Sequence, residues 1–227
     1  MTGALQLDHV FVLCAPGAPE AEALLRRGFA EGPRNAHPGQ GTANRRFFFD
    51  DVYLELLWVD DAKAARGASA RVTQLWERWT LRDGGASPFG LVLRRMDERA
   101  ALPFAAREYR PAYLPAGSAI ALADGVPLAE PLIAVLPALP RPRQPAAATP
   151  GRGAVLRSLR RVEVCTPAAG QLSAASRCLR DACVIGYRDG SHALALAFAA
   201  DGDVVHDLHP ALPLVLRGSA PSPGDLR

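Results

Sequence analysis

Two side chains capable of acid–base or metal chemistry lie inside otherwise apolar runs of the sequence. His9 belongs to "LDHVFVLC" (residues 7–14), and Glu55 belongs to "VYLELLWVDD" (residues 52–61). A carboxylate that points inward from so apolar a run is costly to bury unless it has a partner. Three roles are open: His9 and Glu55 as ligands of a divalent metal, Glu55 as a general base beside His9, or the two as a hydrogen-bonded pair without further function.

A second group of polar side chains directly precedes three phenylalanines in "HPGQGTANRRFFF" (residues 37–49). Gly39 and Gly41 would let the backbone approach a ligand closely, and Arg45 or Arg46 would hold an anionic group bidentately. The alternative is a plain turn whose polar side chains bond to the backbone. We expect ligand contact. The expected site residues in this stretch are His37 as a second catalytic group and Gln40, Thr42, Asn44, Arg45 and Phe47 as substrate-binding residues.

The elements that would position these residues alternate between short strands and a few helices. In residues 7–14, a period of two places Leu7, His9, Phe11 and Leu13 on one face of a strand. Strand–helix–strand–strand patterns recur three times along the chain, with a period of roughly 50 to 60 residues. Few helices and short strands favour an α+β fold over a doubly wound α/β sheet.

Composition bounds the class of protein. The chain has 227 residues, 49% of them hydrophobic, and a formal net charge of +3, so it can bury a globular core. No basic run is interleaved with aromatic residues, which argues against nucleic-acid binding. No run approaches the ~20 apolar residues that span a membrane. The cysteines form no CxxC pair and no signal-peptide pattern is present, so we expect a cytoplasmic protein with reduced thiols. These cysteines are Cys14, Cys165, Cys178 and Cys183.

The order of "LDHVFV", a helix ending in "GF", "HPGQGTANRRFFF" and "YLELLWV" resembles the glyoxalase-like domain proteins. These belong to the vicinal-oxygen-chelate superfamily, which includes glyoxalase I, extradiol dioxygenases and bleomycin-resistance proteins. The resemblance implies repeated βαβββ modules that form curved mixed sheets around a cleft. The expected organisation is a first module over residues 5–60, a helical connector over 61–86, a second module over 87–140, a Pro-rich linker over 141–154, a third, partial module over 155–218 and a tail over 219–227.

The resemblance also implies a divalent metal (Zn, Fe, Ni or Mn), with His9 and Glu55 at two of the ligand positions. The chain departs from the family pattern in the second module, because "FGLVLR" and "PLIAVLP" offer no ligand.

Two main functions follow. One is an enzyme, with lyase, isomerase and dioxygenase chemistry all open, that binds a small oxygen-rich or carbonyl-bearing molecule and uses Glu55 as base or ligand. The other is a metal-free protein of the resistance type that binds or sequesters a small molecule without catalysis. A weaker third is an interaction module with a vestigial cleft. Paired modules also make a homodimer possible.

Overall fold

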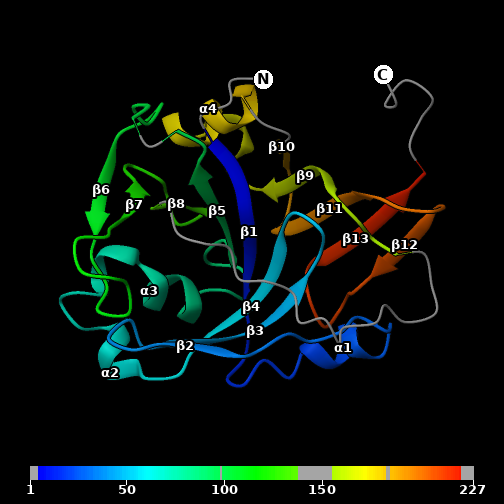
Figure 1. Ribbon diagram of the computed structural model, residues 1–227, viewed down its shortest axis with the longest axis horizontal. Coiled ribbons are helices and arrows are strands. Elements are labelled where there is room, and N and C mark those ends of the chain that lie inside the picture. Colours follow the sequence, from blue (N-terminus) through cyan, green and yellow to red (C-terminus); the bar gives the residue numbers. More distant parts are fainter. Residues whose placement is uncertain (1–4, 98, 138–154, 183–184, 221–227) are drawn as a thin grey trace.

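Two β-sheets that pack against each other make up the protein (Figure 1). The computed structural model describes residues 5–97, 99–137, 155–182 and 185–220. Strands predominate over a few short helices, and the expected α+β class with curved mixed sheets is confirmed.

The larger sheet consists of two copies of one four-strand arrangement. Its order is β2-β3-β4-β1-β5-β8-β7-β6. β1 pairs with β4 and β5 pairs with β8, both in parallel, while β1 and β5 join the two copies as antiparallel neighbours. The strands are β1 (Leu5–Leu13), β2 (Asn35–His37), β3 (Thr42–Phe48), β4 (Tyr53–Val59), β5 (Phe89–Arg95), β6 (Ala106–Tyr109), β7 (Ile120–Ala123) and β8 (Leu132–Leu136). We call β1–β4 the first module and β5–β8 the second module.

The smaller sheet has a different plan. Its five strands follow the order β10-β9-β11-β13-β12, in which β9 is flanked by parallel β10 and antiparallel β11. The strands are β9 (Leu159–Thr166), β10 (Ile185–Asp189), β11 (Ala193–Ala199), β12 (Val204–Asp207) and β13 (Leu214–Ser219). In Figure 1 this sheet stands to the right of the larger one.

The helices are short, and local residues explain where they begin and end. The connector after β4 divides into three pieces because Gln74 takes a left-handed conformation (φ 56°) between the second and the third. Asp61 begins the first piece by accepting hydrogen bonds from the backbone N–H groups of Lys63 and Ala64, as a helix N-cap does. The helices are α1 (Ala21–Leu25), α2 (Ala62–Ala65), η1 (Arg71–Thr73), α3 (Leu75–Thr80), η2 (Ala169–Gln171) and α4 (Ala174–Ala182).

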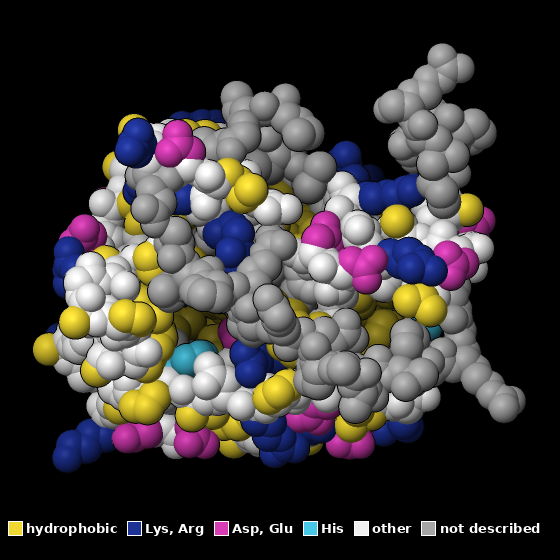
Figure 2. Space-filling model, in the orientation of Figure 1, with side chains coloured by type: hydrophobic (Ala, Val, Ile, Leu, Met, Phe, Trp, Pro, Cys, Tyr) yellow, Lys and Arg dark blue, Asp and Glu magenta, His cyan; other side chains and the backbone are white. Residues whose placement is uncertain are grey.

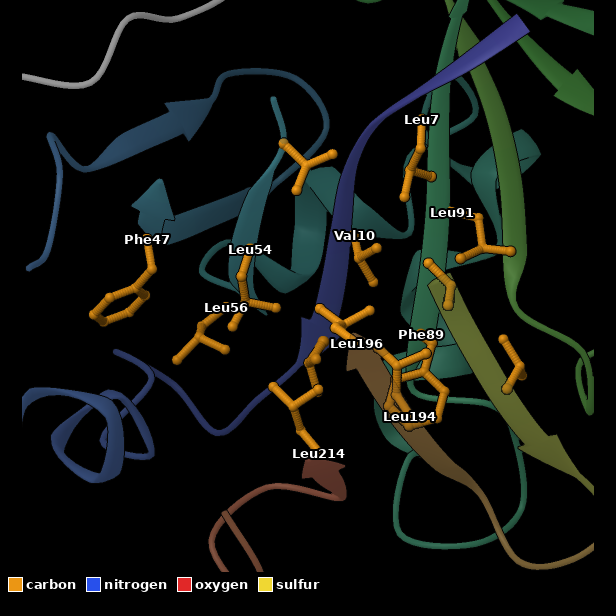
Figure 3. Packing of buried hydrophobic residues seen from close by; sticks show 14 of the residues in the cluster. Leu7, Val10, Phe47, Leu54, Leu56, Phe89, Leu91, Leu194, Leu196 and Leu214 are labelled. Carbon is orange, nitrogen blue, oxygen red and sulfur yellow. The ribbon is translucent and has the colours of Figure 1, made fainter. Parts of the chain in front are cut away.

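The two faces of the larger sheet have different surroundings. One face packs against the smaller sheet in a continuous apolar core, in which Val10 and Leu54 meet Leu196 and Leu214 (Figure 3). The opposite face carries a separate apolar cluster that includes Phe11 and Val92 and is joined by Leu75 of α3. The second sheet therefore supports the larger sheet from behind and leaves its other face available for a site.

A buried arginine fixes the position of α3 on this face of the larger sheet. Arg78, 1% exposed, donates hydrogen bonds to the backbone carbonyls of Pro127, Leu128 and Glu130 just before β8. Burial lowers its pKa to about 10. The Glu130 carboxylate in turn accepts hydrogen bonds from the Ser173 and Ser176 hydroxyls, so one short segment joins α3, β8 and α4.

Two expectations about elements need correction. The repeat predicts a helix in the second module after β5, but the described residues between β5 and β6 contain none. Period two also predicts Leu7 on the face of His9, whereas the register of β1 against β5 shifts between these two residues. Leu7 consequently packs in the core on the other side. The predicted linker at 141–154, Cys183 and most of the predicted tail lie outside the described residues.

No helix within the described ranges is long and apolar enough to cross a membrane.

Candidate active site

The exposed face of the larger sheet contains a cavity of about 220 Å³ that both modules line. Figure 2 shows a hollow on this side of the molecule, with hydrophobic side chains inside it and a histidine and a positively charged side chain at its edge. The ionisable lining comes mainly from the first module: Asp8, His9, His37, Arg46, Tyr53 and Glu55. The second module contributes mostly apolar side chains: Val92, Ile120, Leu122, Leu132, Ala134 and Leu136.

An irregularity in β1 turns both Asp8 and His9 toward this cavity. His9 faces Val92 in the register and Leu7 faces Leu93, so Asp8 is the extra residue on its strand. Such a bulge allows two consecutive side chains to serve one face, which regular pleating forbids. His9 stacks on Tyr53 of β4, with ring centroids 4.3 Å apart. The ring plane of His9 is thereby fixed.

Asp8 holds His9 from one side and is itself held by Arg94. The His9 Nδ1 atom lies 2.8 Å from Asp8 Oδ1, and Arg94 Nε donates to Asp8 Oδ2 at 2.7 Å. Burial alone would raise the pKa of Asp8, but the bonds from His9 and Arg94 outweigh it and hold the pKa below its usual value. Asp8 is therefore an ionised acceptor, so Nδ1 of His9 carries the hydrogen of this bond. The Nε2 atom is left to face the cavity side.

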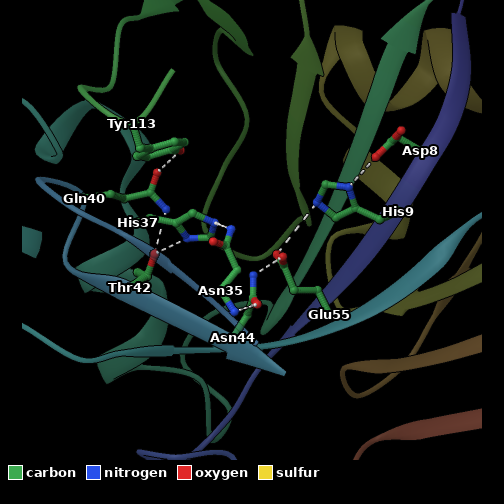
Figure 4. Close-up of polar contacts among 9 residues, drawn as sticks. All are labelled: Asp8, His9, Asn35, His37, Gln40, Thr42, Asn44, Glu55 and Tyr113. Carbon is green, nitrogen blue, oxygen red and sulfur yellow. Dashed lines mark hydrogen bonds and ion pairs between the residues drawn. The ribbon is translucent and has the colours of Figure 1, made fainter. Parts of the chain in front are cut away.

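Glu55 lies beyond His9 and is held by Asn44. Its Oε2 atom is 3.7 Å from His9 Nε2, and its Oε1 atom accepts a hydrogen bond from the Asn44 amide nitrogen (Figure 4). Asn44 is fully buried, and its amide oxygen accepts from the backbone N–H of Asn35 at 3.1 Å. These two partners fix the orientation of the amide, because a flipped group would set oxygen against carboxylate. Asn44 thus positions Glu55 with one oxygen occupied and the other directed at His9.

A chain of side-chain bonds continues from Asn35 to the edge of the cavity. The His37 ring lies between the Asn35 amide (Nε2, 3.2 Å) and the Thr42 hydroxyl (Nδ1, 2.9 Å). The Gln40 amide donates to the same hydroxyl at 2.8 Å and accepts from the Tyr113 hydroxyl at 2.7 Å. Burial lowers the pKa of His37; Glu55 opposes this shift, and His9 and Arg46 add to it. His37 is consequently neutral at pH 7, with both ring nitrogens engaged in this chain.

Gly41 allows the turn that carries these hydrogen-bonded side chains to approach helix α2 closely. Gly41 has φ 75°, and a Cβ atom there would lie 2.3 Å from the backbone oxygen of Asp61. Its own carbonyl accepts the N–H groups of Asp60 and Asp61. The turn between β2 and β3 can therefore pack directly on the start of α2. Gly39 shares a left-handed φ of 82°, but a Cβ atom added there would meet no described residue within 4 Å, which is typical of an exposed turn residue.

The residues present do not fit the metal site that the family resemblance implies, in which the second module supplies ligands beside His9 and Glu55. His9 and Glu55 converge, but the cavity-lining residues of β5 and β8 in the second module are Val92, Leu132, Ala134 and Leu136 plus Arg94, and aliphatic and guanidinium groups are not metal ligands. Among the described residues, no group of three or more His, Cys, Asp or Glu side chains is arranged to hold a metal ion. Half of the expected ligand set is therefore replaced by apolar side chains.

Two predicted substrate-binding residues belong to the opposite face of β3. Arg45 and Phe47 alternate with Asn44 and Arg46, so they point away from the cavity toward the core. Arg45 forms an ion pair with Glu31 and donates to the Ala18 carbonyl at 3.2 Å. Phe47 is 1% exposed in the apolar core. Period two already separates Asn44 from Arg45, and Arg46 is the arginine that lines the cavity.

The remaining predicted residues do gather in one region. His9, His37, Gln40 and Glu55 line the cavity, while Thr42 and Asn44 lie behind them as hydrogen-bond partners. Sequence reasoning missed Asp8, Asn35, Tyr53, Arg94 and Tyr113, and of the two arginines it considered for an anionic group, Arg46 is the one that lines the cavity. Tyr53 had a usable signal, since it shares the alternating face of Glu55. Asp8 became visible only with the bulge.

Comparisons with known proteins agree with this architecture. Residues 7–107 match the family model of the glyoxalase-like domain. A hypothetical protein from Staphylococcus aureus, whose crystal structure is known, is similar in fold, with a TM-score of 0.53 and 12% identity, over 96% of this chain and 99% of that one. A Streptomyces coelicolor methylmalonyl-CoA epimerase in complex with 2-nitronate-propionyl-CoA aligns with a TM-score of 0.41 and 16% identity, over 61% of this chain and 99% of that one. No curated protein matches the sequence. Residues 7–107 are therefore similar to the glyoxalase-like domain, as the motifs in the first part of the sequence predicted.

Proposed function

We propose that the cavity binds a small carbonyl-bearing molecule and that Glu55 and His9 move a proton on it without a metal. The observation that carries this proposal is the His9–Glu55 pair. In each partner, one polar atom is held by a hydrogen bond to a neighbouring side chain, and the other polar atom is directed at the cavity. Asp8 occupies Nδ1 of His9, and Asn44 occupies Oε1 of Glu55. The two remaining atoms, Nε2 and Oε2, are 3.7 Å apart at the cavity.

The chemistry of these two atoms suits enolisation of a ketone. A carboxylate facing a mostly apolar cavity can accept a proton from the carbon next to a carbonyl group. In that step the C–H bond breaks, its electron pair forms the enolate double bond, and the proton moves to Glu55 Oε2. The N–H of His9, when Nε2 is protonated, donates to the enolate oxygen. Return of the proton from Glu55 to a different carbon atom of the enolate completes an isomerisation, and replacement of the carboxyl proton by one from solvent before its return to carbon gives an exchange.

The experiment measures exchange of ketone α-protons for deuterium by NMR, with acetone and acetophenone as a small and a ring-sized probe. We expect the protein to accelerate exchange of at least one of them, and Glu55→Gln to reduce the rate by about 10²- to 10⁴-fold. The substitution keeps the shape of the side chain, because the new amide still accepts from Asn44 and donates to His9. Glu108→Gln is the matched control, since Glu108 is an exposed partner of Arg110. Equal exchange rates with wild-type protein and Glu55→Gln would contradict the proposal.

A second candidate function is ligand binding without catalysis. The apolar second module favours it, because such a surface holds a ligand but supplies no reacting group. Its signature is a ketone that binds saturably while its α-protons exchange no faster than in buffer.

A further inference from the structure

Arg46 is a charged group of the cavity that the proton-transfer step does not use. Its Nε atom donates to the Pro33 carbonyl at 2.9 Å, and its guanidinium lies over the Phe48 ring, 5.6 Å from the centroid. These two contacts fix the plane of the guanidinium. Within the described part of the chain, neither terminal nitrogen of Arg46 forms an ion pair. They remain available as two parallel donors.

The register makes this lack of an ion pair informative. Arg46 on β3 lies directly opposite Glu55 on β4, and oppositely charged cross-strand neighbours commonly pair. Here Asn44 and His9 occupy Glu55 instead. Of the other arginines nearby, Arg94 pairs with Asp8 and Arg45 with Glu31. Arg46 is therefore the cavity-lining cation whose charge the surrounding carboxylates leave uncompensated.

The position of Arg46 sets where an anionic group would lie. Side chains directly opposite on antiparallel strands have Cβ atoms about 4.5–5.5 Å apart. Arg46, Glu55 and His9 all line the cavity, so a ligand whose carboxylate is bound by the terminal nitrogens of Arg46 can present a neighbouring carbonyl group to Glu55 and His9. A planar guanidinium matches a carboxylate in two parallel hydrogen bonds.

The second module sets the size and character of the rest of the ligand. A dry cavity of about 150 Å³ holds a benzene ring, and this cavity measures about 220 Å³. The space left beyond a ring is that of a short side chain. Val92, Leu132 and Ala134 would form an apolar surface under the ring.

We propose that the ligand is a small aromatic or similarly bulky 2-oxo carboxylate, with its carboxylate on Arg46, its carbonyl at His9 and Glu55, and its apolar body on the second module. This proposal rests on the proposed function, because it takes the His9–Glu55 pair as the place of the carbonyl. It goes further by assigning the anion site and the substrate class.

The test compares two ligands of equal shape and different charge. Benzoylformate carries the carboxylate, and benzoylformamide replaces it with a neutral amide. Isothermal titration of wild-type protein should show tighter binding of benzoylformate. Arg46→Gln should weaken benzoylformate about 10- to 100-fold, the usual worth of a hydrogen bond to a charged group, and should change benzoylformamide by less than about threefold. Arg34→Gln is the control, because Arg34 is an exposed arginine that bonds to Glu31 and is not among the residues that line the cavity.

Three results would contradict the inference. Equal affinity for the two ligands, or an unchanged benzoylformate affinity in folded Arg46→Gln, would show that Arg46 does not bind the anion. Failure of both ligands to bind wild-type protein would show that the ligand class is wrong. In each case the exchange assay with acetone and acetophenone still decides the proposed function separately, because those probes lack the carboxylate.

Discussion

The two modules of the larger sheet have the same strand order and opposite chemistry. In the first, β1, β3 and β4 present Asp8, His9, Arg46 and Glu55 to the cavity, whereas in the second, β5 and β8 present mainly Val92, Leu132 and Ala134. Backbone pairing is alike in both, since β1–β4 and β5–β8 are parallel pairs in corresponding positions. The fold thus repeats, and the site does not.

Under the proposed function, this difference explains how the cavity can act without the metal ligands that the family resemblance implies for the second module. A metal shared between modules needs donors from both. A proton-transfer pair needs only two groups with fixed orientation, and the first module supplies these with their supports, aided by Arg94 from β5. The second module is then free to provide shape and an apolar environment, which strengthens the electrostatic interactions of the first.

The largest effect on stability is expected from removing the Asp8 carboxylate, which holds His9 and pairs with Arg94. Asp8→Asn removes the carboxylate that pairs with Arg94, and loss of one partner of a buried ion pair costs about 3–5 kcal/mol. Chemical denaturation at pH 7 should show this loss in the free energy of unfolding. The control is Asp124→Asn, which breaks the exposed Arg107–Asp124 pair of the second module and should cost less than about 1 kcal/mol. Similar losses in the two variants would contradict the difference between the modules.

The Asp8–Arg94 ion pair also predicts that the stability of the protein depends on pH. The pKa of Asp8 is lower in the folded protein than its usual value of 3.8, so the unfolded chain binds this proton more readily. The stabilisation is fully present above pH 3.8 and is lost as the pH falls through the lowered pKa. Asp8→Asn should therefore flatten the decline of stability in this acid range relative to wild-type protein.

An intermediate effect on stability is expected between β1 and β5, where the two modules meet. Gly90 of β5 lies against Phe11 of β1, and a Cβ atom there would be 2.0 Å from the ring. Gly90→Ala must displace the ring within the apolar cluster, at a cost of about 1–3 kcal/mol. Thermal or urea unfolding measures this cost, and the double variant Gly90→Ala with Phe11→Leu should recover part of it. Gly170→Ala is the control, because no atom of the residues that the structure describes lies within 4 Å of its added Cβ. Equal losses at Gly90 and Gly170 would show that this contact is unimportant.

Much of the fold followed from residue patterns, because those patterns are local. The order of motifs carried the family resemblance that implied the repeated modules. Alternation in "YLELLWV" is enough to place Glu55 on one face with Tyr53 and Leu57, and all three line the cavity. The missing second-module ligands were also visible in the sequence. By contrast, the expected helix after β5 was inferred from the repeat alone, and the described residues there contain none.

What the sequence could not supply depended on register and on contacts between distant residues. Asp8 reaches the cavity through a shift in pairing with β5, which no pattern within β1 reveals. Arg94 approaches Asp8 from 86 residues away, and Tyr113 approaches Gln40 from 73. The choice of Arg45 over Arg46 did not depend on such contacts. Alternation with Asn44 is sufficient to place Arg46, and not Arg45, on the cavity face.

The smallest effects should come from two tyrosine hydroxyls on the same side of the sheet, and they should have opposite signs. The Tyr109 hydroxyl of the second module is buried and has no hydrogen-bond partner among the described residues, and burial raises its pKa to about 12. Tyr109→Phe removes an unsatisfied buried group and should stabilise the protein by about 1 kcal/mol. Tyr113→Phe removes the bond to Gln40 and should destabilise it by a similar amount. Urea unfolding of the two variants compares the same chemical change in an apolar and in a polar setting. A loss of stability in Tyr109→Phe would mean that this hydroxyl is satisfied in solution, and the second module would then be less apolar than its lining indicates.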